Sequence, residues 1–319
     1  MTDATLSTSP DASPGGQPSG LPRRRFRVGR KALPYLLSLP ALLACIGILI
    51  PFFTAVAYSL QRYRLSQPWA RKWNWGDNYI NFLSDPAFWN TLKVSLTYAF
   101  LTVGIELLLG LGIAMLLQKR TKFNNFVSIM LLMPLMTAPA LASLMWKLMT
   151  NPGFGILSYF ATLIGIEDFR WASAPSSAMF TVVLVDVWVY TPFIMILLLA
   201  GLRSLPQQPF EAAALDGVPR WFVFWRITLP MLTPFLLTAV LFRVIESIQQ
   251  FDIIYAMTQG GPGDKLTVFQ VEAYLNFFQS TNVGRSAALL MILWAITYLL
   301  SNYFIKSWLR LRERQRGEA

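Results

Sequence analysis

Six stretches of this chain are apolar over about 20 residues or more, and polar or charged segments separate them. They cover residues 34–60, 92–117, 126–149, 178–201, 231–257 and 287–309. A helix of about 20 apolar residues, rising about 1.5 Å per residue, crosses the ~30 Å hydrocarbon core of a bilayer. Six such helices could not share the interior of one small soluble domain. The pattern therefore predicts an all-α polytopic membrane protein, with six transmembrane helices in a domain at 33–309.

The two ends of the chain differ from this domain in composition. Residues 1–32 are rich in Ser, Pro and Gly and too poor in apolar side chains to offset the entropy of folding, so we expect a disordered cytoplasmic tail. The last part of this tail carries a basic cluster, Arg23, Arg24, Arg25, Arg27, Arg30 and Lys31. A signal peptide or twin-arginine signal also places basic residues before an apolar run, but its run is only about 7–15 residues long. We therefore interpret the cluster as an anchor before an uncleaved first helix, and residues 310–319 as a second basic cytoplasmic tail.

The positive charge of the chain follows the predicted helices. Of the 319 residues, 55% are hydrophobic and 13% are charged, and 27 Lys and Arg against 16 Asp and Glu give a net charge of +11. Most basic residues fall before the first helix, in alternate loops and after the last helix, which by the positive-inside rule places both termini in the cytoplasm. The first outer loop departs from that rule, because it carries Arg62, Arg64, Arg71 and Lys72. We therefore expect membrane lipid, and no nucleic acid, as the partner of most of this charge.

The sequence lacks the residues that several kinds of chemistry require. The chain has no histidine and a single cysteine, Cys45, which excludes a His-ligated metal site and an internal disulfide. It also lacks a G-x-x-x-x-G-K-[ST] sequence, so it cannot bind ATP through a phosphate-binding loop of that type. We expect no metal, no cofactor and no catalytic residue in this chain, and energy for its work must come from another subunit.

The loop between the fourth and fifth predicted helices has a composition of its own. Its Ala-rich run from Glu211 to Asp216 predicts a short helix with an acidic first turn. Gly217 is suited to end that helix, because glycine readily adopts the left-handed conformation. Residues 218–226, which include several aromatic side chains, predict a second short helix, and Pro230 begins the next membrane helix. Composition alone is equally consistent with an amphipathic anchor lying on lipid headgroups.

The spacing in this loop resembles the EAA motif of binding-protein-dependent ABC transporter permeases. The motif E-A-A-x-x-x-G-x(9)-I-x-L-P is filled by Glu211, Ala212, Ala213, Gly217, Ile227, Leu229 and Pro230. Two further segments resemble the carbohydrate-uptake branch: A-L-D-G at 214–217, which includes Asp216, and F-D-I-I-Y-A-M-T-Q-G-G-P at 251–262. The resemblance extends from about residue 33 to the C-terminus. It points to the six-span subunit of maltose and glycerol-phosphate type that pairs with a second, related permease in a heterodimer.

The resemblance implies a non-catalytic transport subunit of the bacterial inner membrane. In the family, two copies of an ATP-binding subunit hold ATP and Mg²⁺, and an extracytoplasmic binding protein delivers the solute, here a mono- or oligosaccharide. A cleft of the ATP-binding subunit receives the EAA loop, residues 211–230 of this chain, as a coupling helix. By that resemblance Glu211 pairs with a basic residue of the ATPase. Ala212 and Ala213 allow close approach, and Gly217 provides the bend.

Polar side chains on two predicted helices are candidates for the solute pathway. Ionisable groups inside a bilayer are costly and usually face a cavity or a partner. Six such side chains share helix faces: Asp186 and Tyr190 on the fourth helix, and Arg243, Glu246, Ser247 and Gln250 on the fifth. Counting about 1.5 Å per residue from the helix ends places Asp186 and Arg243 at similar depth, which predicts an ion pair. These side chains suit sugar hydroxyls, and the resemblance adds that related permeases bind solute on these two helices.

Other interpretations of these residues are open at this point. Arg243 and Glu246, three residues apart, could form a plain structural pair. Glu106 on the second helix has no obvious partner, so gating and contact with another subunit are both possible roles. A polyol or glycerol phosphate is an alternative solute, because Arg243 suits a phosphate. From a different class, an ion-coupled secondary transporter could use Glu106, Asp186 or Glu246.

Overall fold

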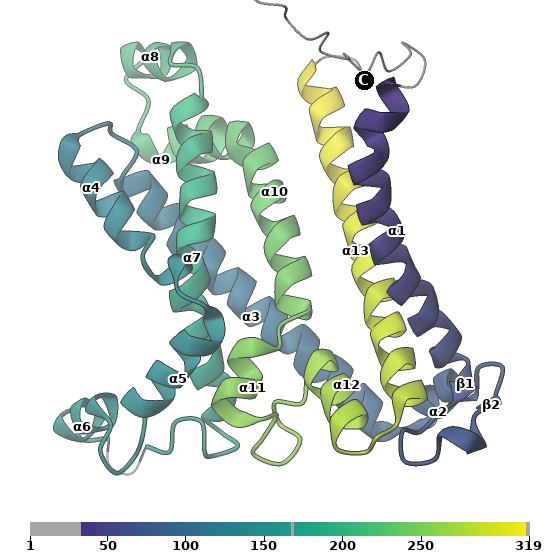
Figure 1. Ribbon diagram of the computed structural model, residues 1–319. Coiled ribbons are helices and arrows are strands. Elements are labelled where there is room, and N and C mark those ends of the chain that lie inside the picture. Colours follow the sequence, from purple (N-terminus) through teal and green to yellow (C-terminus); the bar gives the residue numbers. More distant parts are fainter. Residues whose placement is uncertain (1–32, 167–168, 317–319) are drawn as a thin grey trace, which may run out of the picture. The chain divides into compact units, whose positions relative to one another are not determined.

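The computed structural model describes residues 33–166 and 169–316, and most of them are helical (Figure 1). The helices are α1 (Leu33–Ser59), α2 (Asp77–Ser84), α3 (Pro86–Leu116), α4 (Lys122–Leu131), α5 (Pro139–Met149), α6 (Ile156–Leu163), α7 (Ala178–Ser204), α8 (Gln208–Leu215), α9 (Arg220–Val223), α10 (Leu229–Ile248), α11 (Asp252–Thr258), α12 (Phe269–Phe278) and α13 (Val283–Arg316). Short helical turns η1 (Pro68–Ala70), η2 (Pro134–Met136) and η3 (Phe224–Thr228), and strands β1 (Gln61–Arg62) and β2 (Lys72–Trp73), complete the set. The predicted disordered tail at 1–32 lies outside the described residues.

Among the described residues, five helices are long and apolar enough to cross a membrane. They are Leu37–Ser59, Pro86–Leu116, Ala178–Ser204, Arg220–Ile248 and Val283–Arg310, and each corresponds to one of the predicted stretches. Several of their ends differ from the prediction. The helix predicted at 92–117 already begins at Pro86. The helix predicted at 231–257 spans Arg220–Ile248, and α11 follows it separately. The helix predicted at 287–309 begins at Val283 and continues to Arg316.

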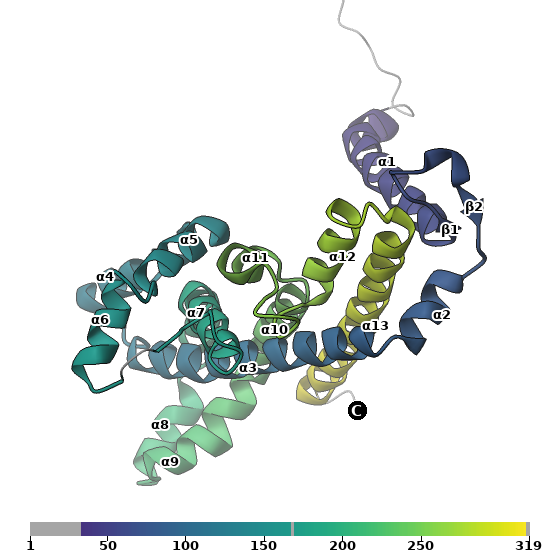
Figure 2. The same cartoon turned by 90° about the horizontal axis from the view of Figure 1, so that it is seen from below.

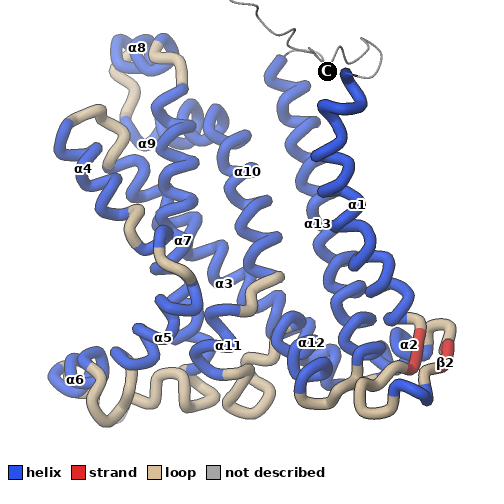
Figure 3. The backbone as a smooth tube through the Cα atoms, viewed as in Figure 1, coloured by secondary structure: helices blue, strands red, loops and turns tan. Residues whose placement is uncertain are grey.

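The prediction of a continuous helix over 126–149 is wrong. The chain there forms α4, the single turn η2 and α5, with loop between them (Figure 3). Pro134 and Pro139 explain the break, because proline lacks the N–H needed for the helical hydrogen bond and disfavours helical geometry at the preceding residue. Thr137 and Ala138, just before Pro139, are extended. Hydrophobicity alone does not register this interruption.

The described chain divides into two compact units between Pro51 and Phe52, within α1. The shorter unit is the first part of α1, whose apolar side chains are largely exposed, as expected of a helix surrounded by lipid. In the larger unit, α3 and α7 make the most extensive contact, and α10 packs against α3, α7 and α13 (Figure 2). Fully buried side chains such as Tyr98, Ile194 and Leu232 fill the space between these helices.

Polar connections gather at the two ends of the larger unit. At one end, α8 and α9 link α7 to α10, and at the opposite end lie β1, β2, α2 and α12 (Figure 1). The two short strands are antiparallel, with Gln61 opposite Trp73 and Arg62 opposite Lys72. The long helices between these ends therefore hold two separate polar surfaces apart.

Of three glycines on α3, one is required by close packing. Glycines on membrane helices often allow two backbones to approach, and Gly104, Gly110 and Gly112 suit that role. A Cβ atom at Gly110 would lie 2.7 Å from Ile194 Cγ2 and 3.1 Å from the Met195 backbone nitrogen of α7. A Cβ at Gly104 or Gly112 would meet nothing within 4 Å. The α3–α7 contact therefore depends on Gly110 alone among the three.

Substituting these glycines separates close packing from helix propensity. We expect Gly110→Ala to destabilise the chain by about 1–3 kcal/mol, because α7 must move to admit the methyl group. Gly104→Ala and Gly112→Ala serve as matched controls and should be neutral, or stabilising by up to about 1 kcal/mol, because alanine favours the helix. Thermal unfolding of the isolated chain in detergent measures all three variants, and equal melting temperatures would contradict the assignment.

Candidate functional site

The sharp bend predicted after the Ala-rich run is present. Helix α8 spans Gln208–Leu215, so it begins ahead of the predicted start at Glu211. Gly217 has a left-handed φ of +67°. The Val218 N–H donates to the Ala213 carbonyl at 3.0 Å, as in glycine-terminated helices. The bend is therefore a defined turn rather than a loose loop.

Beyond the bend, the prediction of a second separate helix at 218–226 is wrong. Helix α9 runs through the π-helical turn η3 directly into α10, so that Arg220–Ile248 is one continuous apolar helix. Ile227 lies inside the π turn, and Leu229 and Pro230 begin α10. A π turn interrupts the regular hydrogen-bond ladder, which accommodates a proline that has no N–H to donate.

The surface around the bend exposes both charge and apolar area. Glu211, Ala212 and Asp216 are exposed on α8 and its end, whereas Ala213 is buried. The Leu215 side chain is 90% exposed, and Trp221 on α9 is also largely exposed. We call this surface, residues 208–221, the α8–α9 knob.

A second candidate site lies inside the helix bundle, where Arg243 of α10 is surrounded by carboxylates. Its Nε and Nη2 donate to the two oxygens of Glu106 on α3, at 2.6 and 2.8 Å. Nη2 also donates to Asp186 on α7 at 2.8 Å, and Nη1 donates to Glu246 at 2.9 Å. The guanidinium carbon lies 4.0 Å from the centre of the Tyr190 ring. Three helices therefore contribute carboxylates to one cation, with the paired geometry that a guanidinium favours.

Most of the cluster is closed to solvent in this chain. Arg243, Glu106 and Asp186 are each 0% exposed, whereas the Glu246 side chain is 45% exposed. Removing charges from water is costly, and good geometry with several hydrogen bonds is what offsets that cost. Four of the five N–H donors of Arg243 bond to these carboxylates, so within the described residues no pair of adjacent donors is left for a solute.

Two further hydrogen bonds extend the cluster along α10. The Ser247 and Thr102 hydroxyls are 2.8 Å apart, which ties α10 to α3. Gln250, just beyond the end of α10, donates from Nε2 to Asp186 Oδ1 at 3.4 Å, a long bond to α7. Ser247 and Gln250 are both buried. All six of the predicted pathway residues therefore gather around this cluster.

The predicted ion pair between Asp186 and Arg243 is confirmed, and the alternative pair with Glu246 is present as well. The two interpretations are therefore compatible. What the sequence did not predict is the partner of Glu106, which is Arg243 at 2.6 Å. A signal was available, because Tyr98, Thr102 and Glu106 recur every four residues and form a polar stripe on one face of α3.

Removing members of the cluster one at a time tests which contacts stabilise the bundle. Arg243→Met should be the most destabilising change, by about 3–5 kcal/mol, because it leaves buried carboxylates without their cation. Glu106→Ala should also be strongly destabilising, whereas Glu246→Ala, the matched change at a half-exposed position, should cost less than about 1 kcal/mol. Thermal unfolding in lipid nanodiscs ranks the stabilities of these variants. Equal decreases in melting temperature for Glu106→Ala and Glu246→Ala would show that burial does not determine the cost.

Comparison with known proteins shows which family this chain belongs to. Residues 106–316 match the family described as binding-protein-dependent transport system inner membrane component. The trehalose/maltose transport system permease protein MalF of Thermococcus litoralis is 32% identical over 275 residues, which are 86% of this chain and 92% of that protein. The trehalose transport system permease protein SugA of Mycobacterium tuberculosis is 31% identical over 289 residues, with 89% and 91% covered. The sulfoquinovosyl glycerol transport system permease protein SmoG of Agrobacterium fabrum is 29% identical over 289 residues, with 90% and 94% covered.

The fold is also similar to a solved structure. A bacterial ABC transporter involved in the import of the acidic polysaccharide alginate contains a chain with a TM-score of 0.75, 18% identity, and coverage of 88% of this chain and 96% of that chain. At this identity the likeness supports the fold only. The family match begins at Glu106 and includes the bend at Gly217 and the cation Arg243. The chain therefore belongs to the inner membrane components of binding-protein-dependent transport systems, as a multi-pass, non-catalytic permease subunit of an ABC transporter.

Proposed function

We propose that this permease subunit forms half of the translocation pathway for a neutral sugar in an ABC importer. The observation that carries the proposal is the pairing of Arg243 with three carboxylates, those of Glu106, Asp186 and Glu246. The relatives named for trehalose and maltose transport support a saccharide. A second permease of the same family completes the pathway as a heterodimer, and an extracytoplasmic binding protein delivers the sugar.

The charge balance of the cluster favours a neutral solute over glycerol phosphate. Three carboxylates surround one guanidinium, so a phosphate approaching the half-exposed Glu246 meets negative charge and no available cation. Sugar hydroxyls, by contrast, donate hydrogen bonds to carboxylate oxygens. In the described conformation only Glu246 is open to a solute. We propose that Asp186, Tyr190, Ser247 and Gln250 reach the solute when α7 and α10 separate.

We propose six membrane crossings with both termini in the cytoplasm. Five crossings are the long apolar helices, and the third in sequence is the broken segment α4–η2–α5. Irregular backbone at membrane depth is tolerated where neighbouring protein covers it, and η2 packs against α7. The α8–α9 knob lies at the same end as the C-terminal end of α13, which supports a cytoplasmic position for both (Figure 1).

We propose that the α8–α9 knob is the coupling element. Its exposed Glu211 and Leu215 would enter a cleft of an ATP-binding subunit, two copies of which hold ATP and Mg²⁺. The knob connects to Arg243 through one uninterrupted helix, Arg220–Ile248. A rigid helix transmits displacement of one end to the other, so docking movements would reach the ion cluster directly.

Reconstituted uptake tests the proposed solute class. Proteoliposomes containing this chain, its partner permease and the ATP-binding subunits should take up trehalose or maltose when ATP and the binding protein are supplied. A tenfold excess of glycerol 3-phosphate should leave uptake unchanged, because no free cation faces the solute. Uptake that survives ATP depletion but is abolished by an uncoupler would instead indicate an ion-coupled secondary transporter.

A charge reversal on the knob tests the coupling role. Glu211→Lys should reduce sugar uptake by at least about tenfold, because it replaces an interfacial anion with a cation. The isolated chain should keep its melting temperature, because Glu211 is exposed. Gln208→Lys adds a positive charge to the same helix at another exposed position and is the matched control. Wild-type uptake by Glu211→Lys would remove this residue from the coupling contact.

A further inference from the structure

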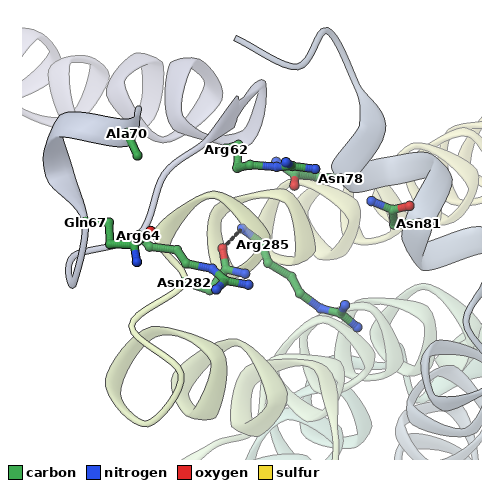
Figure 4. A pocket seen from close by; sticks show the side chains of 8 residues that line it. All are labelled: Arg62, Arg64, Gln67, Ala70, Asn78, Asn81, Asn282 and Arg285. Carbon is green, nitrogen blue, oxygen red and sulfur yellow. Dashed lines mark hydrogen bonds between the residues drawn. The ribbon is translucent and has the colours of Figure 1, made fainter. Parts of the chain in front are cut away.

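A basic pocket lies at the end of the larger unit opposite the α8–α9 knob. It forms where the β1–β2 loop, residues 61–73, meets α2 and the start of α13 (Figure 4). Its volume is about 480 Å³. The side chains that define its chemistry are three guanidinium groups and four amides, from Arg62, Arg64, Arg285, Gln67, Asn78, Asn81 and Asn282. Nothing in the proposed transport cycle uses this pocket.

The pocket is preformed by backbone contacts between distant parts of the chain. Arg64 and Asn282 form an antiparallel bridge, and the Leu65 N–H donates to the Thr281 carbonyl at 2.8 Å. A Cβ atom at Gly284 would lie 2.1 Å from the Gln61 carbonyl oxygen, so only glycine allows this approach. The β1–β2 loop is therefore held against α13, and its arginines are presented in fixed positions.

The positive charge of the pocket is only partly neutralised. Arg285 donates to Asp85 at 2.7 Å and lies over the Phe82 ring, so its charge is paired within the chain. The hydrogen bond from Arg285, together with the Ala87 N–H, holds the pKa of Asp85 below its ordinary value. Among the described residues, neither Arg62 nor Arg64 has a carboxylate within 4.0 Å, and both are exposed. Two guanidinium forks are therefore free for an external anion.

The surroundings of the pocket favour a protein partner. Trp69 on this loop and Trp75 just beyond β2 are 83% and 85% exposed. Trp and Arg are the residues enriched where proteins bind most tightly. Tryptophan and arginine also occur together at lipid headgroups. Here, however, the free arginines line a concave site with amides between them, a geometry that receives a protruding side chain. The family is defined by its dependence on a binding protein, which supplies such a partner.

We infer that this pocket receives a carboxylate side chain from an acidic loop of the extracytoplasmic solute-binding protein, bound by the guanidinium groups of Arg62 and Arg64. The inference rests on the proposed importer function and on the proposed orientation, which places the β1–β2 loop outside the cytoplasm. Arginine binds carboxylate through two parallel hydrogen bonds, which fixes both position and direction. The pocket would therefore set the register in which the binding protein docks. It also gives a role to the basic residues of the first outer loop, which depart from the positive-inside rule.

A binding measurement tests this inference. The probe is the solute-binding protein that supports ATP-dependent uptake with wild-type transporter, applied to the assembled transporter in nanodiscs of zwitterionic lipid. Arg62→Glu/Arg64→Glu should lower its affinity at least about tenfold and flatten the salt dependence of association. Lys265→Glu, a single charge reversal of the same kind at an exposed loop residue outside the pocket, should change affinity less than twofold. Arg62→Gln/Arg64→Gln repeats the test without introduced negative charge, and melting temperatures identify any variant that fails to fold.

The outcomes separate the docking site from the proposed function. Normal uptake by wild-type transporter with unchanged affinity in both double variants overturns the docking site and leaves the importer function intact. A loss of affinity that occurs only in nanodiscs containing anionic lipid assigns the pocket to lipid headgroups and overturns the inference. If no binding protein supports uptake by wild-type transporter, the proposed function and the docking site fall together.

Discussion

A guanidinium inside a bilayer cannot be left without partners, and the packing of α3, α7 and α10 depends on this constraint. Arg243 is completely buried, so groups on neighbouring helices must neutralise its charge. Helix α3 supplies the carboxylate of Glu106, and α7 supplies that of Asp186. Rotating either helix by one residue, about 100°, would withdraw its carboxylate. Replacing buried ion pairs with apolar residues can be neutral or stabilising, so the main effect of this cluster is to select one arrangement of three helices.

Two of these helices, α7 and α10, also border the α8–α9 knob. The two candidate sites are therefore physically connected. On one side, α7 ends at Ser204 and α8 begins at Gln208, so the connection is short. On the other side, the continuous helix from Arg220 covers about 35 Å before it reaches Arg243, at about 1.5 Å per residue. The α8–α9 knob is therefore joined directly to the two helices that carry Asp186 and Arg243. If the knob is the coupling element that we propose, its movement would act on the helices that hold the ion cluster.

Local patterns predicted what depends on local sequence. Gly217 ends α8 as expected, because the left-handed turn is a property of one residue and its neighbours. The third predicted helix failed because summed hydrophobicity does not register the missing N–H groups of Pro134 and Pro139. The partner of Glu106 required knowing which faces of α3 and α10 meet, and the basic pocket required the contact between Gln61 and Gly284. Both features arise from tertiary packing. Periodicity describes the faces of one helix at a time and does not predict which faces of different helices meet.

Arginines in this chain follow two different rules, according to the solvent around them. In the bundle, Arg243 is fully neutralised, because an unanswered charge in hydrocarbon is costly. In the β1–β2 loop, water solvates the guanidinium groups of Arg62 and Arg64, so they can stay unpaired without that cost. In the proposed orientation their position weakens the charge asymmetry that directs insertion, and the larger basic clusters near the termini would outweigh them. Binding an anionic partner is a role that the exposure of these two arginines permits.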